Sequence, residues 1–161
     1  MAKRLGDGDP LIGIVMGSFS DQPKMQAAGV ILERFGVPYE MNVISAHRTP
    51  DQAHEYAKLA EERGLEVIIA AAGRAAHLAG IMAANTILPV IGVPIFTEQL
   101  AGADSLYSTV QMPSGVPVAT VGLSNATNAA ILAVQMLALS REDLRQQLRN
   151  FKKELSQGLK I

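Results

Sequence analysis

Short apolar runs alternate with amphipathic stretches along the chain. The runs that predict strands cover residues 11–16, 39–44, 66–72, 89–93 and 116–121. Apolar runs of this length, separated by helical patterns, are typical of βαβ units in which helices cover both faces of a parallel sheet. The pattern therefore predicts a single three-layer α/β/α domain over residues 1–161, with a parallel sheet of about five strands.

Helices are predicted between the strands, where apolar residues recur at helical spacing. In the first of them Met25 and Ala28 share a face, and Gly36 provides a C-terminal stop. The sequence Thr49-Pro50-Asp51-Gln52 predicts a capping box that opens a helix running to Gly64. Further helices are expected after residue 75, around residues 104–110, over residues 125–139 and over residues 141–161, while residues 1–10 form an N-terminal extension.

The stretch 125–139 consists almost entirely of alanine and larger apolar residues. A helix that is apolar nearly all round is usually buried on every side. The outer helices of a domain of this size are half exposed, so we expect a second subunit to cover this helix. The alternative is that the last helix of the same chain covers it. The protein is therefore predicted to be a homo-oligomer.

Composition excludes several kinds of function. Lys plus Arg number 14 and Asp plus Glu 15, so the net charge is −1 and no basic cluster is present that would bind a nucleic-acid backbone. Cysteine is absent, which excludes thiol chemistry, and the three histidines form no spaced metal motif. The sequence also lacks G-x-G-x-x-G, Walker A and G-x-S-x-G motifs, which argues against dinucleotide binding, P-loop chemistry and a hydrolase triad.

No membrane segment is predicted. Residues 75–97 carry no charge, but Asn85, Pro89 and Pro94 divide them into pieces too short to span a bilayer. Residues 1–10 contain charged side chains and no apolar core, unlike a signal peptide. We therefore expect a cytoplasmic protein.

Three segments that follow predicted strands carry candidate chemistry, because ligands bind beyond the carboxyl ends of the strands of an open parallel sheet. The first is Gly17-Ser18-Phe19-Ser20-Asp21. Its hydroxyl and backbone N–H groups can donate to an anion, and Asp21 can accept from sugar hydroxyls. The alternative is that these serine and aspartate residues are ordinary helix caps.

The second segment is Ser45-Ala46-His47-Arg48-Thr49-Pro50. Arg48 offers a planar fork for phosphate and Ser45 a further donor, while His47 can move protons near neutral pH. This mixture suits a phosphorylated ligand. The alternative makes His47 a turn residue and Arg48 a solvated charge.

The third segment, residues 71–80, places His77 among small residues that let the backbone approach a flat ring closely. A capping or packing role for His77 is an equal alternative. His54 lies at the flank of the apolar face of a predicted helix, and we expect it to be structural.

These segments together resemble the PurE family of purine biosynthesis. The resemblance rests on Gly17-Ser18-Phe19-Ser20-Asp21, Ser45-Ala46-His47-Arg48-Thr49-Pro50, Ala75-Ala76-His77-Leu78 and Asp104-Ser105-Leu106-Tyr107-Ser108-Thr109-Val110-Gln111-Met112-Pro113, and it covers residues 11–140. It implies a flavodoxin-like domain that assembles as a homo-octamer, with each active site built from more than one subunit. It also implies a functional link to an ATP-dependent carboxyaminoimidazole ribonucleotide synthase.

By this resemblance the activity is that of a class I N5-carboxyaminoimidazole ribonucleotide mutase, which moves a carboxylate from the exocyclic nitrogen to ring carbon C4 without a metal or cofactor. Ser18, Ser45 and Arg48 are then expected to hold the 5′-phosphate. Asp21 is expected to bind the ribose hydroxyls, and His47 to act as general acid and base. The remaining substrate-binding residues are expected to be Ser20, Gly73, Ala75, Ala76, His77 and Leu78.

Arg74 departs from the class I pattern, which is usually GAGGAAHLPG where this chain reads AAGRAAHLAG. Ala72-Gly73-Arg74 is similar to the AGRS of class II members, which add free CO₂ to aminoimidazole ribonucleotide. Arg48 agrees with class I, whereas the segment 122–128 is shorter than in class I. We expect the mutase, with a class II-like carboxylase or a non-catalytic nucleotide-binding protein as alternatives.

Overall fold

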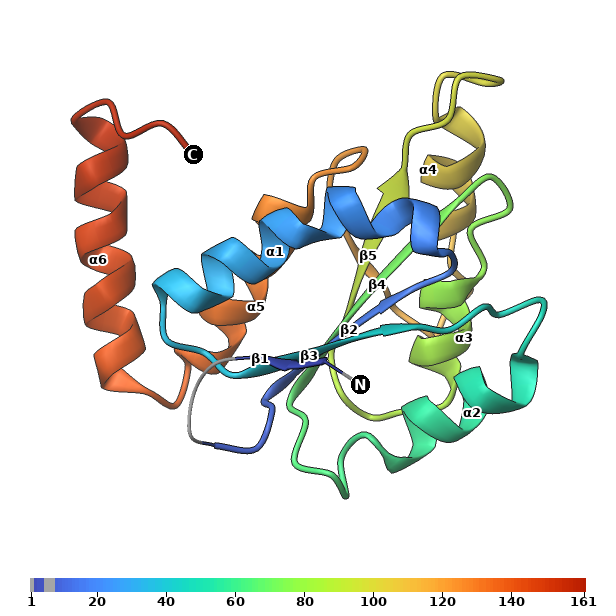
Figure 1. The fold of residues 1–161 in the computed structure, drawn as a ribbon, viewed down its shortest axis with the longest axis horizontal. Helices are drawn as coiled ribbons and strands as arrows, with labels where there is room; N and C mark the ends of the chain where they lie inside the picture. The colour runs from blue at the N-terminus through green and yellow to red at the C-terminus, as the bar shows by residue number, and fades with distance from the viewer. Residues whose placement is uncertain (1, 5–7) are drawn as a thin grey trace.

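The computed structural model of the chain describes residues 2–4 and 8–161, which form one sheet flanked by helices (Figure 1). The strands are β1 Ala2–Arg4, β2 Ile12–Met16, β3 Tyr39–Val43, β4 Val67–Gly73, β5 Val90–Ile95 and β6 Ala119–Thr120. They lie in the order β1-β3-β2-β4-β5-β6, and every neighbouring pair from β3 to β6 is parallel. This confirms the predicted flavodoxin-like α/β fold.

The two edge strands differ from the prediction. β1 lies in the segment expected to be an extension, and it pairs antiparallel with β3, with Ala2 opposite Met41. A short edge strand needs only backbone hydrogen bonds on one side, so no apolar pattern in the sequence predicts it. β6 is shorter than the predicted run 116–121. Pro117 has no N–H for the ladder, and the N–H of Val116 donates to Pro113 in a turn.

The central strands of the sheet consist of buried, mostly apolar residues. Every residue of β2 and β5 is buried, which requires cover on both faces. Ile12 and Ile14 belong to one layer of the core, whereas Val15 belongs to the other. Successive side chains of a strand point to opposite faces, so the two layers follow directly from the sequence of each strand.

The helices are α1 Gln22–Arg34, α2 Pro50–Leu59, α3 Leu78–Ala84, α4 Ala103–Val110, α5 Ala126–Leu137 and α6 Glu142–Ser156, with a 3-10 turn at Phe19–Asp21. α1 and α5 cover one face of the sheet and α2 and α3 the other (Figure 1). α4 packs against β5, where Gly92 is required because a Cβ there would lie 2.4 Å from Cγ2 of Thr109. None of the described helices is long and apolar enough to cross a membrane.

α5 is covered within its own chain. Its buried side chains, among them Ile131, Val134 and Leu137, belong to a helix that packs against α1, β4, β5 and α6. The sheet and two helices of the same chain cover these positions, which agrees with the alternative of cover from within the chain, whereas Leu139 in the predicted stretch 125–139 is 76% exposed. The oligomeric state itself stays a prediction.

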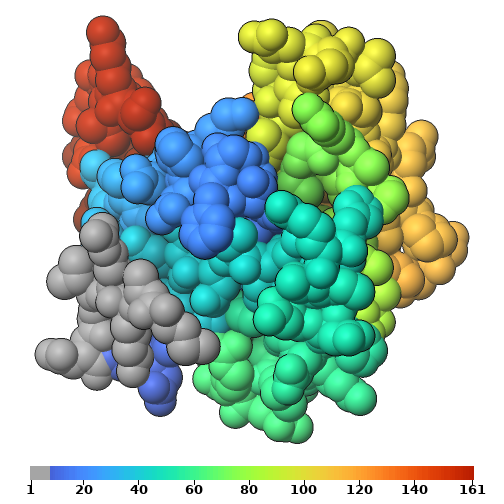
Figure 2. All heavy atoms as spheres, turned by 45° about the vertical axis from the view of Figure 1, so that its right-hand side comes forward, coloured from blue at the N-terminus to red at the C-terminus, as the bar shows by residue number. Residues whose placement is uncertain are grey.

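α6 is amphipathic, as predicted, and packs on the body through its apolar stripe. Leu144 and Phe151 are buried. The Phe151 ring meets Phe35 edge to face with centroids 5.5 Å apart, and Arg34 lies over the same ring and pairs with Glu154. α1 therefore helps α5 to hold the last helix, which stands out at one side of the molecule in Figure 2.

The start of α2 agrees with the prediction, whereas its end and its cap do not. The helix begins at Pro50 but ends at Leu59, and turns lead from there to Gly64 at φ +84°. Thr49 is the N-cap residue, yet its side chain makes no bond to the helix, so the predicted capping box is wrong. The Thr49 hydroxyl bonds to the backbone of Ser45 instead.

A polar cluster fastens α2 to β3. The Tyr56 hydroxyl donates to Oε1 of Glu40 at 2.8 Å, and Arg63 pairs with the same oxygen. Burial and the neighbouring Glu40 carboxylate raise the pKa of Tyr56, so its hydroxyl remains a donor. Gly13 of β2 leaves the necessary room, because a Cβ there would lie 2.2 Å from the Tyr56 hydroxyl oxygen. The cluster fixes the helix that follows the loop 45–49.

Candidate active site

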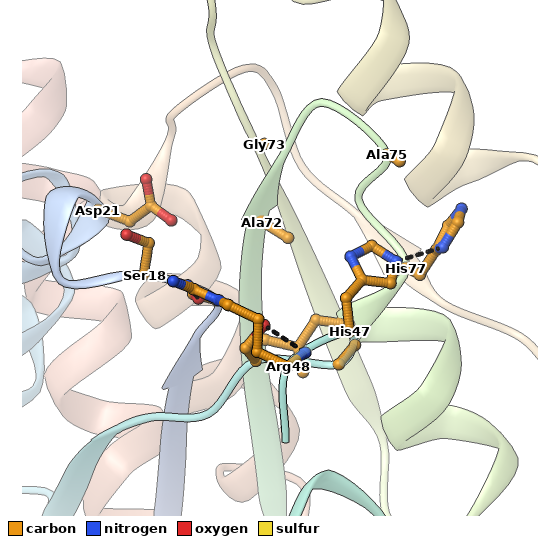
Figure 3. A pocket seen from close by; sticks show the side chains of 12 residues that line it. Ser18, Asp21, His47, Arg48, Ala72, Gly73, Ala75 and His77 are labelled. Atoms are coloured by element: carbon orange, nitrogen blue, oxygen red, sulfur yellow. Dashed lines mark hydrogen bonds between the residues drawn. The ribbon is translucent and has the colours of Figure 1, made fainter. Parts of the chain in front are cut away.

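A cavity of about 300 Å³ opens at the carboxyl ends of β2, β3 and β4 (Figure 3). Its walls are formed by Gly17, Ser18, Asp21, Ser45, Ala46, His47, Arg48, Ala72, Gly73, Ala75, His77 and Leu78. The three strands are neighbours in the sheet, so the loops that follow them meet at one edge. The three segments selected from the sequence thus form a single site.

Most of the predicted site residues line this cavity, but Ser20 and Ala76 do not. Ser20 is exposed, and Ala76 is 1% exposed and belongs to the buried core. A substrate contact for either stays a prediction. Gly17, Ala46 and Ala72 also line the cavity; they lie in the three candidate segments, but no substrate contact is predicted for them. Their small size at the ends of predicted strands is the signal that could have identified them.

The loop after β2 places Ser18 as a hydrogen-bond donor. Ser18 Oγ accepts from the backbone N–H of Ser20 at 3.3 Å and from the Ser20 hydroxyl at 2.9 Å. The Ser20 hydroxyl also lies 3.5 Å from Oδ1 of Asp21, and its single proton can go to only one of these two acceptors. Ser18 donates to a ligand in the cavity when Ser20 donates to Ser18. Ser20 supports Ser18 from outside the cavity.

Ser45 and Arg48 form a second donor group. Ser45 Oγ accepts from the backbone N–H of Arg48 at 3.2 Å and from its Nε at 3.3 Å. Nη2 of Arg48 donates to the carbonyl oxygen of Gly17 at 2.9 Å, so the guanidinium ties the loop after β3 to the loop after β2. Ser45 therefore keeps its hydroxyl proton, and the guanidinium retains N–H groups, for an anion in the cavity.

His47 and His77 form a hydrogen-bonded pair. Nε2 of His47 lies 2.8 Å from Nδ1 of His77, and the rings meet edge to face with centroids 4.8 Å apart (Figure 3). One of these nitrogens donates and the other accepts, so the tautomer of one ring determines the tautomer of the other. The sequence does not predict this pair, because no spacing along the chain connects two loops that follow different strands.

Small residues form the wall contributed by the end of β4 and the loop that follows it. Ala72, Gly73 and Ala75 line the cavity, and a Cβ at Gly73 would lie 3.3 Å from Cγ2 of Thr97. Arg74 between them is exposed and has φ +56°, in the left-handed region. It makes no hydrogen bond or ion pair with the rest of the described chain. An unpaired cation therefore stands beside the cavity in a conformation that favours glycine.

Asp21 provides the carboxylate of the cavity. It is 9% exposed, and burial raises its pKa above the ordinary value of 3.8, while Lys24 and the Ser20 hydroxyl act in the opposite direction. Figure 3 shows Asp21 beside Ser18, across the cavity from the two histidines. Within residues 2–4 and 8–161, no group of three or more histidine and carboxylate side chains could hold a metal ion.

The fold and the cavity together define a flavodoxin-like α/β protein that can bind an anionic ligand at the carboxyl end of its sheet, with an imidazole pair beside that ligand. Comparison with known proteins identifies the family. The family model described as AIR carboxylase matches residues 11–158. The chain belongs to this family.

Individual relatives agree with this assignment. The chain is 61% identical over 146 residues to N5-carboxyaminoimidazole ribonucleotide mutase from Pyrococcus horikoshii, which covers 91% of this chain and 82% of the relative. The mutase of Thermotoga maritima is 56% identical over 91% of this chain and 85% of its own length. Phosphoribosylaminoimidazole carboxylase from Schizosaccharomyces pombe is also 56% identical, over 88% of this chain but only 26% of the relative. The crystal structure of Treponema denticola PurE superimposes with a TM-score of 0.83 at 30% identity, covering 92% of both chains.

Proposed function

We propose that this chain is an N5-carboxyaminoimidazole ribonucleotide mutase, an isomerase of purine biosynthesis that moves the carboxylate from N5 to ring carbon C4. The observation that carries the proposal is the 61% identity, over 91% of this chain and 82% of the relative, to a protein of that name. The relatives named carboxylase are matched over about a quarter of their length. The match to the mutases covers most of both proteins, which favours that activity.

The substrate's 5′-phosphate binds between the loops after β2 and β3. Ser45 keeps a hydroxyl proton, because both acceptor positions of its oxygen are used by Arg48. Ser18 donates to the phosphate while the Ser20 hydroxyl donates to Ser18. Arg48 supplies the positive charge, and its bonds to Ser45 and Gly17 hold the guanidinium in place before a ligand arrives. Asp21, beside Ser18, accepts from the ribose hydroxyls.

His47 moves the proton in both halves of the reaction. It first delivers a proton to N5 as the bond between N5 and the carboxylate carbon breaks, which releases CO₂ and leaves a neutral amine. Ring carbon C4 then attacks CO₂, a carbon–carbon bond forms, and the proton on C4 passes to His47. The proton lost in the first half is recovered in the second, so substrate and product are isomers and His47 ends as it began.

His77 acts on this chemistry through His47. Its Nδ1 lies 2.8 Å from Nε2 of His47, so it holds that ring in one orientation and stabilises the ring when it carries the extra proton. His77 is therefore a partner of the general acid and base.

The small residues of the third loop retain CO₂ between the two halves. Ala72, Gly73 and Ala75 let the backbone lie close to the aminoimidazole ring. A CO₂ molecule held against C4 reacts before it diffuses away, because a bound reactant has a high effective concentration. The reaction needs protons and CO₂ only, so the proposal includes no metal or organic cofactor.

The ultraviolet absorbance of the purified protein mixed with N5-carboxyaminoimidazole ribonucleotide tests the proposal. We expect rapid conversion to the C4 isomer. A parallel reaction with aminoimidazole ribonucleotide plus bicarbonate should show much slower turnover. Binding of the substrate without turnover in either reaction would instead indicate a non-catalytic nucleotide-binding protein.

A second candidate activity, direct carboxylation by free CO₂, is favoured by Arg74. Its unpaired guanidinium stands beside the cavity in place of the glycine usual in class I members, and a cation there would attract bicarbonate. If the bicarbonate reaction is the faster one, Arg74→Gly should lower that rate selectively. An unchanged ratio of the two activities in Arg74→Gly would remove this argument.

The proposal includes a cytoplasmic homo-octamer that works with an ATP-dependent synthase supplying the substrate. Large apolar side chains left exposed, such as Phe19 at 75%, Ile87 at 83% and Tyr107 at 63%, support assembly into an oligomer. Light scattering should give a mass about eight times the 17.1 kDa of one chain. A mass near that of one chain would contradict this part of the proposal.

A further inference from the structure

Thr49 follows Arg48 in the chain and does not line the cavity. Its hydroxyl bonds to both the N–H and the C=O of Ser45. The backbone N–H of Ser45 donates to Thr49 Oγ1 at 3.1 Å, and Thr49 Oγ1 donates to the Ser45 carbonyl oxygen at 3.0 Å. The backbone N–H of Thr49 also donates to that oxygen, at 2.9 Å. One hydroxyl thus closes residues 45–49 into a ring of hydrogen bonds.

This ring fixes the residues that face the cavity. Thr49 holds the backbone N–H and C=O of Ser45, and Ser45 Oγ accepts two hydrogen bonds from Arg48. Arg48 in turn reaches the carbonyl of Gly17. His47 lies inside the closed segment and is held at its other end by His77. A continuous chain of contacts therefore runs from the Thr49 hydroxyl to both the anion-binding groups and the imidazole pair.

A helix cap does not explain this arrangement. Thr49 precedes α2, but its side chain makes no bond to an N–H of that helix. The helix is instead held by Pro50 at its first position and by the Tyr56–Glu40–Arg63 cluster. The hydroxyl therefore serves the loop and not the helix.

We propose that Thr49 is a positioning residue, whose hydroxyl holds loop 45–49 in the conformation that presents Ser45, His47 and Arg48 to the substrate. The inference rests on the proposed function, because it takes loop 45–49 to bind the substrate of that reaction. Without the hydroxyl, Ser45 N–H and C=O lose a partner each and the loop gains conformational freedom. Binding must then order the loop, which weakens affinity and misplaces His47.

Two substitutions separate the hydroxyl from the rest of the side chain. Thr49→Val keeps the shape and removes both hydroxyl bonds, and Thr49→Ser keeps the hydroxyl and removes a methyl group. We expect Thr49→Val to raise KM about tenfold, the size of effect for a hydrogen bond or two, and to lower kcat as well. Thr49→Ser should lie within about twofold of the parent, since hydroxyl groups of both residues can make the same bonds.

Thr109→Val is a matched control. The Thr109 hydroxyl donates to the carbonyl of Ser105 at 2.7 Å, four residues earlier, as Thr49 does to Ser45. Thr109 is buried in α4 against Gly92 and lines no part of the cavity. Loss of the Thr109 hydroxyl in Thr109→Val should lower the melting temperature and leave KM unchanged.

Titration with ribose 5-phosphate, a probe that needs no turnover, keeps this inference separate from the proposed reaction. Thr49→Val should weaken its binding about tenfold even if the parent protein turns over neither substrate. Parental KM and parental ribose 5-phosphate affinity in a folded Thr49→Val would overturn the inference, and so would equal impairment of Thr49→Ser. If Thr49→Val does not fold, Thr49→Ala provides the same comparison with a smaller side chain.

Discussion

The two loops that face each other across the cavity are held in different ways. Loop 45–49 is held by its own polar side chains, since Ser45, Arg48 and Thr49 bond to one another. In loop 73–77, by contrast, the one side-chain hydrogen bond in the described structure is that of His77 to His47. Its other residues are small, apart from Arg74 in a left-handed conformation.

The difference follows from what each loop does in the proposed reaction. Groups that donate to a phosphate or move a proton must be held in one geometry, and a network of hydrogen bonds does this. A wall against a flat ring and CO₂ needs open space, which small side chains leave. Substitutions of the polar residues in loop 45–49 should therefore change activity. Substitutions in loop 73–77 other than at His77 should alter stability or specificity.

The largest effect is expected at the point where the two loops touch. His47→Gln removes the group that moves the proton, so kcat should fall by about 100-fold or more with a smaller change in KM. The absorbance assay with N5-carboxyaminoimidazole ribonucleotide measures this. His54→Gln, an exposed histidine of α2, should leave both constants unchanged. Parental kcat in His47→Gln would make His47 a structural residue.

Arg48→Ala should have the next largest effect. A hydrogen bond to a charged group contributes about 1.5–3 kcal/mol, so KM should rise by about tenfold to 100-fold while kcat changes less. Steady-state kinetics with the same substrate separate the two constants. Arg48→Lys keeps the charge but loses the fork that reaches Ser45 and Gly17 together, so it should recover only part of the loss. Full recovery would show that charge alone is needed.

Arg74→Gly tests the strain in the second loop. A left-handed conformation costs a residue with a side chain roughly 1–2 kcal/mol of stability, and glycine avoids this cost. The greater conformational freedom of glycine in the unfolded chain offsets part of that gain in stability. We expect the free energy of unfolding to rise by roughly 0.5 kcal/mol. Ala75→Gly, at a neighbouring position without positive φ, should lower it by a similar amount. Chemical denaturation measures both, and equal signs for the two variants would contradict the interpretation.

The smallest effect concerns Asp21 and pH. Burial raises its pKa in the folded protein, so between the unfolded and the folded pKa the native state binds more protons, and stability falls as pH rises through that window. The destabilisation is fully present at neutral pH and is relieved as pH falls. Asp21→Asn should therefore raise the melting temperature at pH 7 and lose this advantage in acid. An advantage for Asp21→Asn that is the same at every pH would mean that ionisation is not its cause.

Sequence patterns predicted the order of the elements and the loops of the site, because both depend on local features. Apolar runs predicted β2, β4 and β5, and small and polar residues predicted where the strands end. The patterns could not distinguish Ser18 from Ser20. Both serines lie in one motif, and only the fold shows that Ser18 lines the cavity while Ser20 supports it from outside.

Three interpretations were wrong or incomplete for related reasons. The Thr49 hydroxyl was assigned to its own helix, as its local sequence suggests, but a nearer backbone partner at Ser45 was available in the folded loop. α5 was assigned to an interface because its cover by α1 and α6 depends on long-range packing. β1 has too few residues to show a pattern and exists only by pairing with β3.

The sequence by itself determined the α/β fold class, the location of the site at the carboxyl ends of the strands and the residue types that meet there. Periodicity and motif order are properties of the linear sequence. Only the tertiary structure decided which of those groups touch. The bond between His47 and His77, the reach of Arg48 to Gly17 and the ring closed by Thr49 each join atoms whose separation depends on how the loops fold and on how the strands are ordered. Hydrogen bonds form only within about 3 Å, and no pattern of residue types along the chain specifies distances that short.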